Sequence, residues 1–423
     1  MEELKTPAMP FRPSVERDDV RGAEQALNAT PLPLQGINVL DLSRVLAGPY
    51  CCSMLGELGA EVIKVERPGR GDENRRWGGL WKGESLDYMS VNRNKRDLTV
   101  DIKTRGGQEI IRAIAARSDV LVENFLGSTL DEIGLGYEAL NKLNPRLIYC
   151  SISAYGSRGP LNDKPGYDGA VQAFSGHMAM TGEPEGGPVR TGASMVDMAT
   201  GITAYAAILT AIAGRNVSGK GQRVSVSLLQ TALALMGAHA STFLMTGEEP
   251  KRAGSGVSHL APYGAFHTKD SYVVTGALNR ESWCELCRIL DRTELVDDPR
   301  YADEQARVAN RRALDATLTE TFQTRTTAEW VAWFEQNNFV ISPVNTLHDV
   351  LTHRQVYENE MVVTAQHETA GAVKLVGMPM TFGDWRLEPR RPPPVLGRHT
   401  DEVLGELGYT PQQIATWRNE RVI

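Results

Sequence analysis

The stretch INVLDLSRVLAGPYCCSMLGELGAEVIKV, residues 37–65, decides the fold of this chain. It opens with an apolar run typical of a buried strand, residues 37–42, and closes with a second such run, residues 60–65. Between the two runs, Pro49 suits the first turn of a helix and Gly59 suits its end. A strand, a helix and a strand in about thirty residues form a βαβ unit, in which the strands are parallel and the crossover is right-handed.

The same alternation of apolar runs and helical stretches continues to residue 152. Strands are predicted at Leu98–Ile102, Val120–Val122 and Leu147–Ile152, and helices at Gly107–Ala116 and Leu130–Leu143. This order predicts an α/β fold with a doubly wound parallel sheet, in which ligands bind at the carboxyl ends of the strands.

Beyond the sheet, two long helical stretches are apolar on most faces. They cover Met195–Ala213 and Leu228–Met245, and such helices are buried in a large core or against another subunit. A new strand begins at Tyr272. The amphipathic stretches Leu314–Phe322 and Ala328–Gln336 then predict the helices of a smaller domain.

The composition excludes several classes of partner. Of 423 residues, 41% are hydrophobic and 23% charged, which is the balance of a soluble globular protein. The net charge of −7 argues against nucleic acid or an anionic membrane as the main partner, so an anionic ligand needs a local basic cluster. No run of about 18 apolar residues occurs, and Met198–Ala213 comes nearest.

The N-terminal thirty residues are acidic, which suits neither a mitochondrial presequence nor a secretory signal. We therefore expect a cytoplasmic protein, with a mitochondrial location as the alternative for a eukaryotic one. The five cysteines are an odd number spread along the chain, and this also suits a reducing compartment.

One pair of cysteines, Cys284 and Cys287, has the CxxC spacing of zinc ligands. Trp283, Leu286 and Ile289 surround the pair with apolar side chains. A zinc site would also need further Cys or His partners nearby. We therefore expect no metal, and we assign the pair to a helix that faces the core.

Two nucleotide-binding motifs are incomplete. Glu66 ends the second strand where a ribose-binding acid would stand, but residues 44–49 lack the glycine fingerprint of a dinucleotide site. Residues 214–221, GRNVSGKG, match a phosphate-binding loop up to Lys220. Gly221 then replaces the required Ser or Thr, and the segment runs from helix to strand, the reverse of the usual order.

The segment GYDGAVQAFSG, residues 166–176, carries the candidate functional residue, Asp168. It follows the turn formed by Pro165 and Gly166 and precedes a run that predicts a helix, residues 170–174. The unpaired N–H groups at a helix N-terminus favour a carboxylate there. On position alone, Asp168 is most simply an N-cap residue.

Two further motifs give this segment a second interpretation. Together with DLSRVLAGP, residues 41–49, and GRHTDEVLGELG, residues 397–408, it resembles the class III coenzyme A (CoA) transferases of the CaiB/BaiF type, which include formyl-CoA transferase. The resemblance runs from about Leu32 to the C-terminus, and it implies that Asp168 is the catalytic nucleophile.

The family's reaction sets chemical demands on that residue. An aspartate attacks the donor thioester to give an acyl-aspartyl anhydride and a CoA thiolate, the thiolate forms an aspartyl-CoA thioester, and the acceptor carboxylate then collects CoA. Asp168 must accordingly be ionised, shielded from water and close to donors for the oxyanions. The resemblance implies no permanently bound cofactor, because coenzyme A enters as part of the substrates.

The resemblance also implies which residues contact coenzyme A. These positions are Leu46, Ala47, Arg67, Val100, Asp101, Ile102, Lys103, Asn124, Phe125, Leu126 and Tyr155. Two places depart from formyl-CoA transferase. Glu132 replaces an arginine, for which we expect Lys95 or Arg96 to compensate, and residues 254–256 with His259 replace a glycine-rich lid.

Within the family, residues 61–72 (EVIKVERPGRGD) and 90–103 (SVNRNKRDLTVDIK) are most similar to the succinyl-CoA:glutarate enzymes. The resemblance therefore implies succinyl-CoA as donor and a short dicarboxylic acid as acceptor. The second carboxylate of such an acid needs a cation, because burying it unpaired is costly. Arg44 is our first candidate and Arg190 the second, with His259 as a further substrate contact. The alternative role for Arg44 is support of coenzyme A or of a dimer interface.

Two alternative functions stay open. The related α-methylacyl-CoA racemases use the aspartate together with an upstream histidine, but no histidine precedes His177 here. If Asp168 is only a cap, the chain is a non-catalytic CoA-binding subunit that needs a catalytic partner.

The architecture implied by the resemblance is a Rossmann-like large domain plus a smaller α+β domain, in an interlocked homodimer whose subunits thread each other as linked rings. The expected parts are an N-terminal tail, 1–31; the large domain with the CoA site and nucleophile, 32–225; a linker helix and small domain, 226–345; and a return segment that completes the large domain, 346–423.

Overall fold

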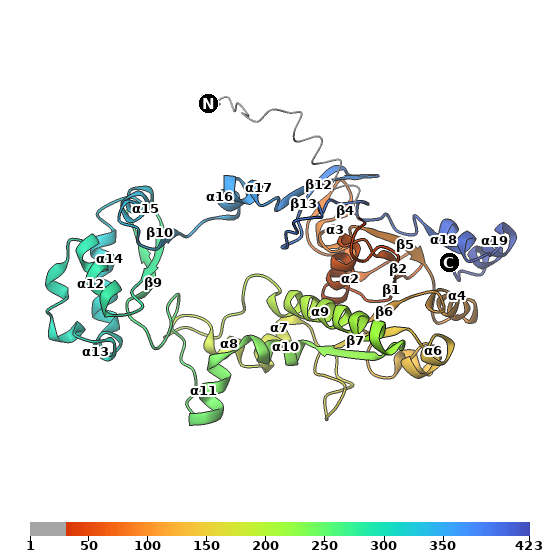
Figure 1. Cartoon of the computed structure of the whole chain (residues 1–423), viewed down its shortest axis with the longest axis horizontal. Coiled ribbons are helices and arrows are strands. Elements are labelled where there is room, and N and C mark those ends of the chain that lie inside the picture. The colour runs from red at the N-terminus through yellow and green to blue at the C-terminus, as the bar shows by residue number, and fades with distance from the viewer. Residues whose placement is uncertain (1–30) are drawn as a thin grey trace.

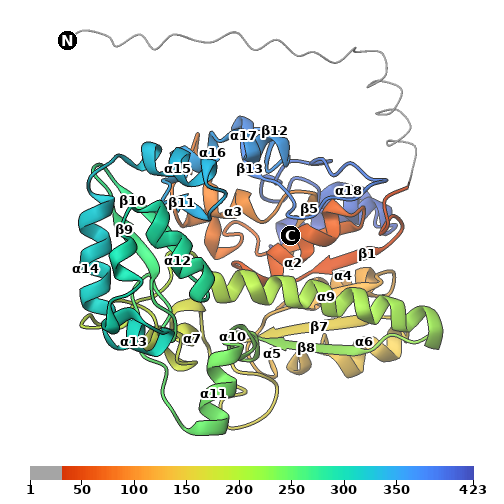
Figure 2. The same ribbon diagram turned by 60° about the vertical axis from the view of Figure 1, so that its left-hand side comes forward.

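The structure, a computed structural model, describes residues 31–423, so the tail expected at residues 1–31 falls almost wholly outside the described part. Figures 1 and 2 show a large α/β lobe and a smaller lobe that contains the helices from α12 (Arg280–Ile289) to α15 (Thr327–Gln336). The small lobe comes from the middle of the chain, whereas the large lobe combines its beginning and its end.

Six parallel strands form the sheet of the large lobe, in the order β5-β2-β1-β6-β7-β8. Their bounds are β1 Asn38–Asp41, β2 Glu61–Glu66, β5 Lys95–Thr99, β6 Val120–Glu123, β7 Ile148–Ser153 and β8 Arg223–Ser227. From β1 the chain builds outward to β2 and β5, then crosses to the other side for β6, β7 and β8. This confirms the doubly wound parallel sheet and puts its switch point between β1 and β6.

The strand predicted at Leu98–Ile102 is displaced, because β5 begins three residues earlier, at Lys95. Lys95 and Arg96 are buried in the strand. Lys95 donates to Asp41 at 2.9 Å, and Arg96 pairs with carboxylates of three glutamates. A search for apolar runs misses a strand whose first residues are paired charges.

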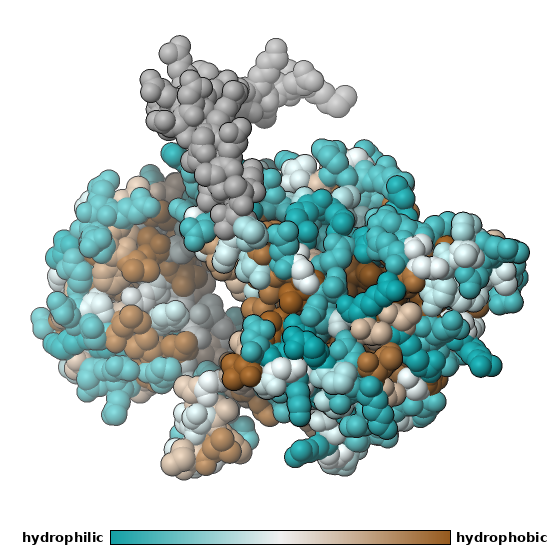
Figure 3. Space-filling model, turned by 45° about the vertical axis from the view of Figure 1, so that its right-hand side comes forward, coloured by the Kyte–Doolittle hydropathy of each residue, from teal (hydrophilic) through white to brown (hydrophobic). Residues whose placement is uncertain are grey.

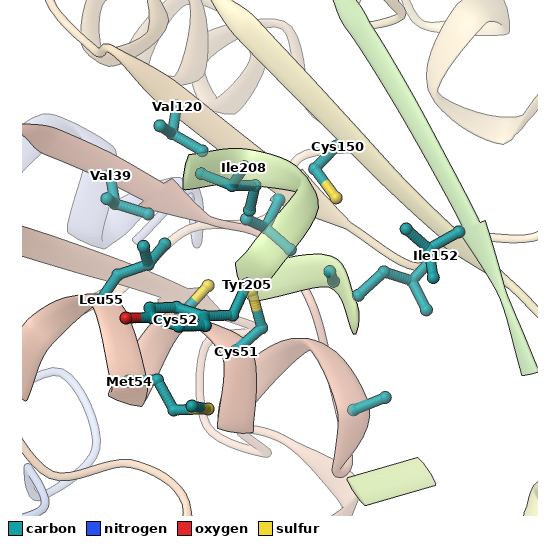
Figure 4. Close-up of a cluster of buried hydrophobic side chains, with 14 of the residues drawn as sticks. Val39, Cys51, Cys52, Met54, Leu55, Val120, Cys150, Ile152, Tyr205 and Ile208 are labelled. Atoms are coloured by element: carbon teal, nitrogen blue, oxygen red, sulfur yellow. The ribbon is translucent and has the colours of Figure 1, made fainter. Parts of the chain in front are cut away.

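Helices cover both faces of this sheet. On one face, α2 (Ala47–Glu57) and α9 (Met195–Ser218) share a core in which Cys51, Cys52 and Cys150 lie near Tyr205 and Ile208 (Figure 4). On the other face lie α4 (Arg105–Ala115), α6 (Tyr137–Leu143), α18 (Thr400–Glu406) and α19 (Pro411–Asn419). Because α18 and α19 are the last two helices, the chain returns from the small lobe to complete this second core.

Two helices predicted as continuous are broken at glycines. The stretch predicted at Leu130–Leu143 forms α5 (Thr129–Glu132) and then α6, with Gly134 at φ 68° between them. The stretch predicted at Leu228–Met245 forms α10 (Leu228–Leu235) and α11 (Ala238–Thr246). These two helices meet at 83°, where Gly237 has φ 50°. Glycine tolerates this left-handed conformation, which the apolar pattern does not reveal.

Helix α9 is longer than predicted and has 24 residues, ending at Ser218, with Gly219 as its C-cap at φ 73°. Among the described residues it is the one helix that is long and apolar enough by itself to span a membrane, judged by length and composition. Its inner face nevertheless lies in the sheet core through Ala204 and Ile208. Its outer face exposes Ile202 and Val217.

The small lobe has its own core around an antiparallel sheet in the order β11-β10-β9. The strands are β9 Tyr263–His267, β10 Tyr272–Gly276 and β11 Ile341–Pro343, and the other helices are α13 Glu304–Ala309 and α14 Arg311–Phe322. Cys287 is buried in this core beside Trp283, which confirms that the CxxC pair belongs to a core-facing helix. Within residues 31–423 no cluster of His, Cys, Asp or Glu side chains suits a metal ion.

The remaining elements are short, and two of them, the turns with Leu295 and Tyr301, belong to the core of the small lobe. These short elements are α3 Leu86–Ser90, α7 Asp168–Phe174, α8 His177–Met180, α16 Leu347–Leu351, α17 Arg354–Glu358, the hairpins β3 Leu80–Trp81 with β4 Glu84–Ser85 and β12 Val362–His367 with β13 Gly371–Val376, and the 3₁₀ turns Glu73–Arg76, Thr293–Leu295 and Pro299–Tyr301.

Figure 3 shows hydrophobic residues gathered where the two lobes face each other.

Candidate functional site

Loops at the carboxyl ends of the strands converge on a cavity of ≈ 780 Å³. The turn after β1 contributes Arg44 to Ala47, the loop after β6 contributes Asn124 to Gly127, and the long loop after β7 leads to Asp168. The first turn of α9 closes the cavity with Ser194 and Asp197. The cavity therefore lies at the sheet edge where a doubly wound fold binds its ligands.

Asp168 lies in the wall of this cavity and is only 4% exposed. Its Oδ2 accepts hydrogen bonds from the backbone N–H groups of Val196 at 2.9 Å and Asp197 at 3.2 Å. The N-cap interpretation is therefore wrong, because Tyr167 occupies that position and the carboxylate accepts from backbone N–H groups of the first turn of α9 instead of those of its own helix.

The other oxygen of Asp168, Oδ1, faces two side chains. Gln172 donates to it from Nε2 at 2.6 Å, and Arg190 Nε lies 3.6 Å away. Gln172 is fully buried, and it also exchanges hydrogen bonds with the hydroxyl and the N–H of Thr191. One amide thus fixes both the carboxylate and the loop that carries Arg190.

Neighbouring titratable groups favour their neutral forms. Burial, and after it the negative charge of Asp168, raises the pKa of Asp197 to about 7. Burial lowers the pKa of His177, although Asp168 opposes that shift. A carboxyl that is desolvated beside another carboxylate holds its proton. Below about pH 7 Asp197 is therefore neutral and adds no negative charge beside Asp168.

Five of the predicted coenzyme A contacts line the cavity: Leu46, Ala47, Asn124, Phe125 and Leu126. The others are outside its lining but follow the ends of strands at the same sheet edge. Arg67 after β2 and Lys103 after β5 are exposed. Val100 is buried, Asp101 and Ile102 are half-buried, and Tyr155 contacts Phe174 edge to face at 5.2 Å.

Two of the three predicted substrate residues, Arg44 and Arg190, line the same cavity, and His259 does not. Arg44 lines the cavity, donates to Glu73 at 3.0 Å and lies over the ring of Phe125 at 5.0 Å. Arg190 lies beside Asp168, as described above. His259 is exposed in a turn between the lobes and is not among the residues that line the cavity.

The prediction that Lys95 or Arg96 compensates for the missing arginine at position 132 is wrong. Glu132 is exposed and accepts a hydrogen bond from Ser128. Lys95 and Arg96, however, are buried in the ion pairs of β5, so neither side chain is available to a phosphate.

Several site residues were missed by sequence reasoning. Gln172 lies four positions after Asp168, the spacing that places two side chains on one helix face, so this signal was present. Asp197 carried only the weaker signal of an acid in the first turn of a helix. Lys164 adds a third cation to the cavity lining, from the loop after β7.

The structure explains both incomplete nucleotide motifs. Glu66 is buried and accepts two hydrogen bonds from Arg75, at 2.8 and 2.7 Å, and one from the Tyr88 hydroxyl at 2.8 Å. It therefore has no place for a ribose. Gly221 serves close packing, since a Cβ there would lie 2.1 Å from the carbonyl oxygen of Leu147.

Comparison with known proteins assigns the chain to a family. Residues 34–400 match the model of CoA-transferase family III. The chain is 42% identical to the human succinyl-CoA:glutarate CoA-transferase over 376 residues, 89% of this chain and 86% of that protein. It is 37% identical to the succinate–glutarate CoA-transferase of Agrobacterium fabrum, over 89% of this chain and 96% of that protein.

A solved structure supports the same assignment. A CaiB/BaiF family protein from Brucella suis superposes with a TM-score of 0.82 at 35% identity, covering 89% of this chain and all of that chain. The parallel central sheet described above is the sheet of this structural family.

Proposed function

Because the chain belongs to CoA-transferase family III, we propose that it moves coenzyme A from succinyl-CoA to a short dicarboxylic acid, with Asp168 as the nucleophile. One observation carries the role of Asp168. Its carboxylate is buried at the wall of a cavity large enough for a thioester, and backbone and side-chain donors hold both of its oxygens.

We propose that the reaction takes the course that the resemblance to the family implies. An oxygen of Asp168 attacks the thioester carbonyl, the C–S bond breaks, and the products are a mixed anhydride and a CoA thiolate. The thiolate attacks the aspartyl carbonyl, and succinate leaves as a carboxylate. The acceptor carboxylate then attacks the aspartyl-CoA thioester, and the released thiolate takes the acyl group of the second anhydride and frees Asp168.

The groups that hold Asp168 also suit the intermediates. If Oδ1 is the oxygen that becomes acylated, Oδ2 is the carbonyl oxygen of the anhydride and keeps the N–H donors of Val196 and Asp197. Such preorganised donors stabilise an oxyanion without reorganisation during the reaction. Burial of Asp168 protects the anhydride from water, which would otherwise hydrolyse it.

In this proposal, each of two arginines binds one carboxylate of the acceptor. Arg190 Nε is 3.6 Å from Asp168, so it suits the reacting carboxylate. Arg44 lines the cavity from the turn after β1 and suits the distal carboxylate of a short diacid. Arg67 and Lys103, exposed at the same edge of the sheet, are our candidates for the phosphates of coenzyme A.

We also propose a homodimer of the linked-ring type. The side chains that support it are large, apolar and exposed in the single chain, on α10, on α11 and in the connection from the small lobe: Leu233, Leu235, Phe243, Leu244, Met245, Val340, Val344, Leu347, Val350, Leu351 and Tyr357. None of the residues of α11 is buried. A second subunit would cover such a helix, which has no core of its own to enter.

Trapping the covalent intermediate tests the function. Purified protein is incubated with succinyl-CoA, treated with borohydride or hydroxylamine, digested and mapped by mass spectrometry. We expect the label on Asp168, and we expect Asp168→Asn to lose transfer to glutarate by about three orders of magnitude or more. Asp401→Asn, at an exposed aspartate of α18, serves as the control.

A label on another residue, or an active Asp168→Asn enzyme, contradicts the assignment. Loss of the α-proton from a 2-methylacyl-CoA without transfer to any acid would instead favour the racemase alternative.

A further inference from the structure

The turn that follows β1, residues 43–45, is held almost entirely by side chains. The N–H of Ser43 donates to Asp41 Oδ1 at 3.0 Å, and its carbonyl accepts from Lys64 Nζ at 3.0 Å. Asn124 binds the next residue twice, accepting from the N–H of Arg44 at 2.9 Å and donating to its carbonyl at 2.8 Å.

Val45 completes the same pattern. Its N–H lies 3.1 Å from both carboxylate oxygens of Asp72, and its carbonyl accepts from Asn74 Nδ2 at 2.7 Å. All six backbone polar groups of the three residues thus bind side chains, and no helix or sheet ladder supports them. The carboxylate of Asp72 is itself held by Lys64 at 3.0 Å, in an ion pair whose two side chains are fully buried.

Val45 also has a backbone conformation that needs such support. Its φ is 71°, in the left-handed region that a β-branched residue rarely adopts. A residue in this region keeps its conformation only where the surroundings determine it strongly, and such residues gather at functional sites. Val45 lines the cavity together with its neighbours Arg44 and Leu46.

The turn directs one charged side chain. Arg44 reaches Glu73 at 3.0 Å and lies over Phe125, and its Nε has no acceptor among the described residues. Glu73 and Asn74 are consecutive residues of the 3₁₀ turn capped by Asp72. The segment that holds Val45 therefore also carries the carboxylate that orients Arg44.

We propose that Lys64, Asp72 and Asn74 are positioning residues that set the acceptor specificity of this enzyme by holding Val45 in its strained conformation and so aiming Arg44 into the cavity. Lys64 and Asp72 do not line the cavity, so their role requires no contact with substrate. Asn74 does line it, so rescue by Val45→Gly and the exchange of residues 43–45 must distinguish positioning by Asn74 from a direct contact with substrate. The inference rests on the proposed function in one respect, the use of Arg44 for the distal carboxylate of a diacid.

The test compares two acceptors with one donor. The ratio of kcat/KM for glutarate to kcat/KM for butyrate is measured with succinyl-CoA, because both acids attack the same aspartyl-CoA intermediate and effects on coenzyme A cancel. In Asn74→Ala we expect this ratio to fall about tenfold, mainly through the KM of glutarate. If the alanine variant does not fold, Asn74→Asp keeps the volume, replaces the donor with an acceptor and carries the same expectation.

Two further variants separate positioning from general stability. Asn144→Ala is the matched control, since Asn144 also donates to backbone carbonyls, those of Ala115 and Ser118, but is outside the cavity lining. It should leave the ratio unchanged. Val45→Gly, added to Asn74→Ala, should restore part of the ratio, because glycine adopts a positive φ without strain.

Hydrogen exchange of the peptide that contains residues 43–45 gives a readout independent of activity. It should be faster in Asn74→Ala than in wild type or in Asn144→Ala. Equal losses for both acceptors, no rescue by Val45→Gly, or unchanged exchange would each overturn the positioning role. Failure of the proposed function is distinguishable, because it would show in the wild-type enzyme as a lack of preference for glutarate.

Discussion

Asp197 is the residue whose charge changes near neutral pH. Its pKa is raised to about 7, so above that pH it adds a negative charge beside Asp168. The incoming acceptor is also a carboxylate and meets more repulsion there. We expect the KM of glutarate to rise as pH increases through 7, and Asp197→Asn, which stays neutral, to remove this rise. A pH profile that is the same in both proteins would show that another group titrates.

Arg67 tests the binding of the nucleotide. A charge-assisted bond to phosphate is worth roughly 1.5–3 kcal/mol, so Arg67→Ala should raise the KM of succinyl-CoA about tenfold or more. Arg70→Ala, on the same exposed loop, is the control. With a pantetheine thioester, which carries no nucleotide, Arg67→Ala should have no effect. An equal effect on both donors would rule out a phosphate contact.

Residue by residue, the sequence allowed a partial prediction of the site. Asp168 stood out because its surrounding motif resembles a family. Its backbone donors did not, because Val196 and Asp197 lie about thirty residues away and use N–H groups, which carry no information about the side chain. The buried pairs of Lys95 and Arg96 were missed for a related reason. A charged side chain is read as exposed unless the position of its partner is known.

At the scale of elements, the connection from α9 to β8 gives a sharp test of packing. A Cβ on Gly221 would lie 2.1 Å from the Leu147 carbonyl oxygen, and that contact is to backbone, which cannot rotate away. We expect Gly221→Ala to lose about 1–3 kcal/mol of unfolding free energy. The matched variant Gly214→Ala, at an exposed position inside α9, should gain up to about 1 kcal/mol. Thermal unfolding of the two variants checks both, and an unchanged midpoint for Gly221→Ala would contradict the steric reading.

Helix and strand identities followed well from periodicity, whereas breaks and ends did not. The βαβ unit was predicted almost to the residue, since β1 and β2 lie within mainly apolar runs and Pro49 and Gly59 mark the helix between them. The 83° bend between α10 and α11 escaped prediction, because apolar residues continue across Gly237 and only the backbone there departs from helix.

For the whole molecule, the number of chains and the rate of subunit exchange are the main quantities to measure. If the subunits are linked rings, the protein should sediment as two chains even at nanomolar concentration, and tagged and untagged subunits should not exchange unless the protein is unfolded. Denaturing and refolding a mixture should produce hybrids. Ready exchange under native conditions would exclude interlocking and leave an ordinary dimer or a monomer.

No periodicity argument predicts such threading, since it is a property of two chains. The observation that supports the proposed dimer comes from the structure, in which apolar residues such as Leu244 and Met245 are largely exposed in the single chain. The lining of the cavity could not be predicted from local patterns either, because its loops are far apart in the sequence and are brought together only by the order of the strands.

The last described residues lie in the large lobe, and this affects how the protein folds during its synthesis. Val422 and Ile423 are buried, and the Val422 carbonyl accepts from the N–H of Asp101 at 2.7 Å. His399 and Thr400 bind the backbone of β5, the strand at one edge of the sheet. During synthesis, β5 and the apolar face of α4 stay uncovered until α18 and α19 have left the ribosomal exit tunnel. Completion of the large lobe therefore depends on residues 399–423, which follow the small lobe in the chain.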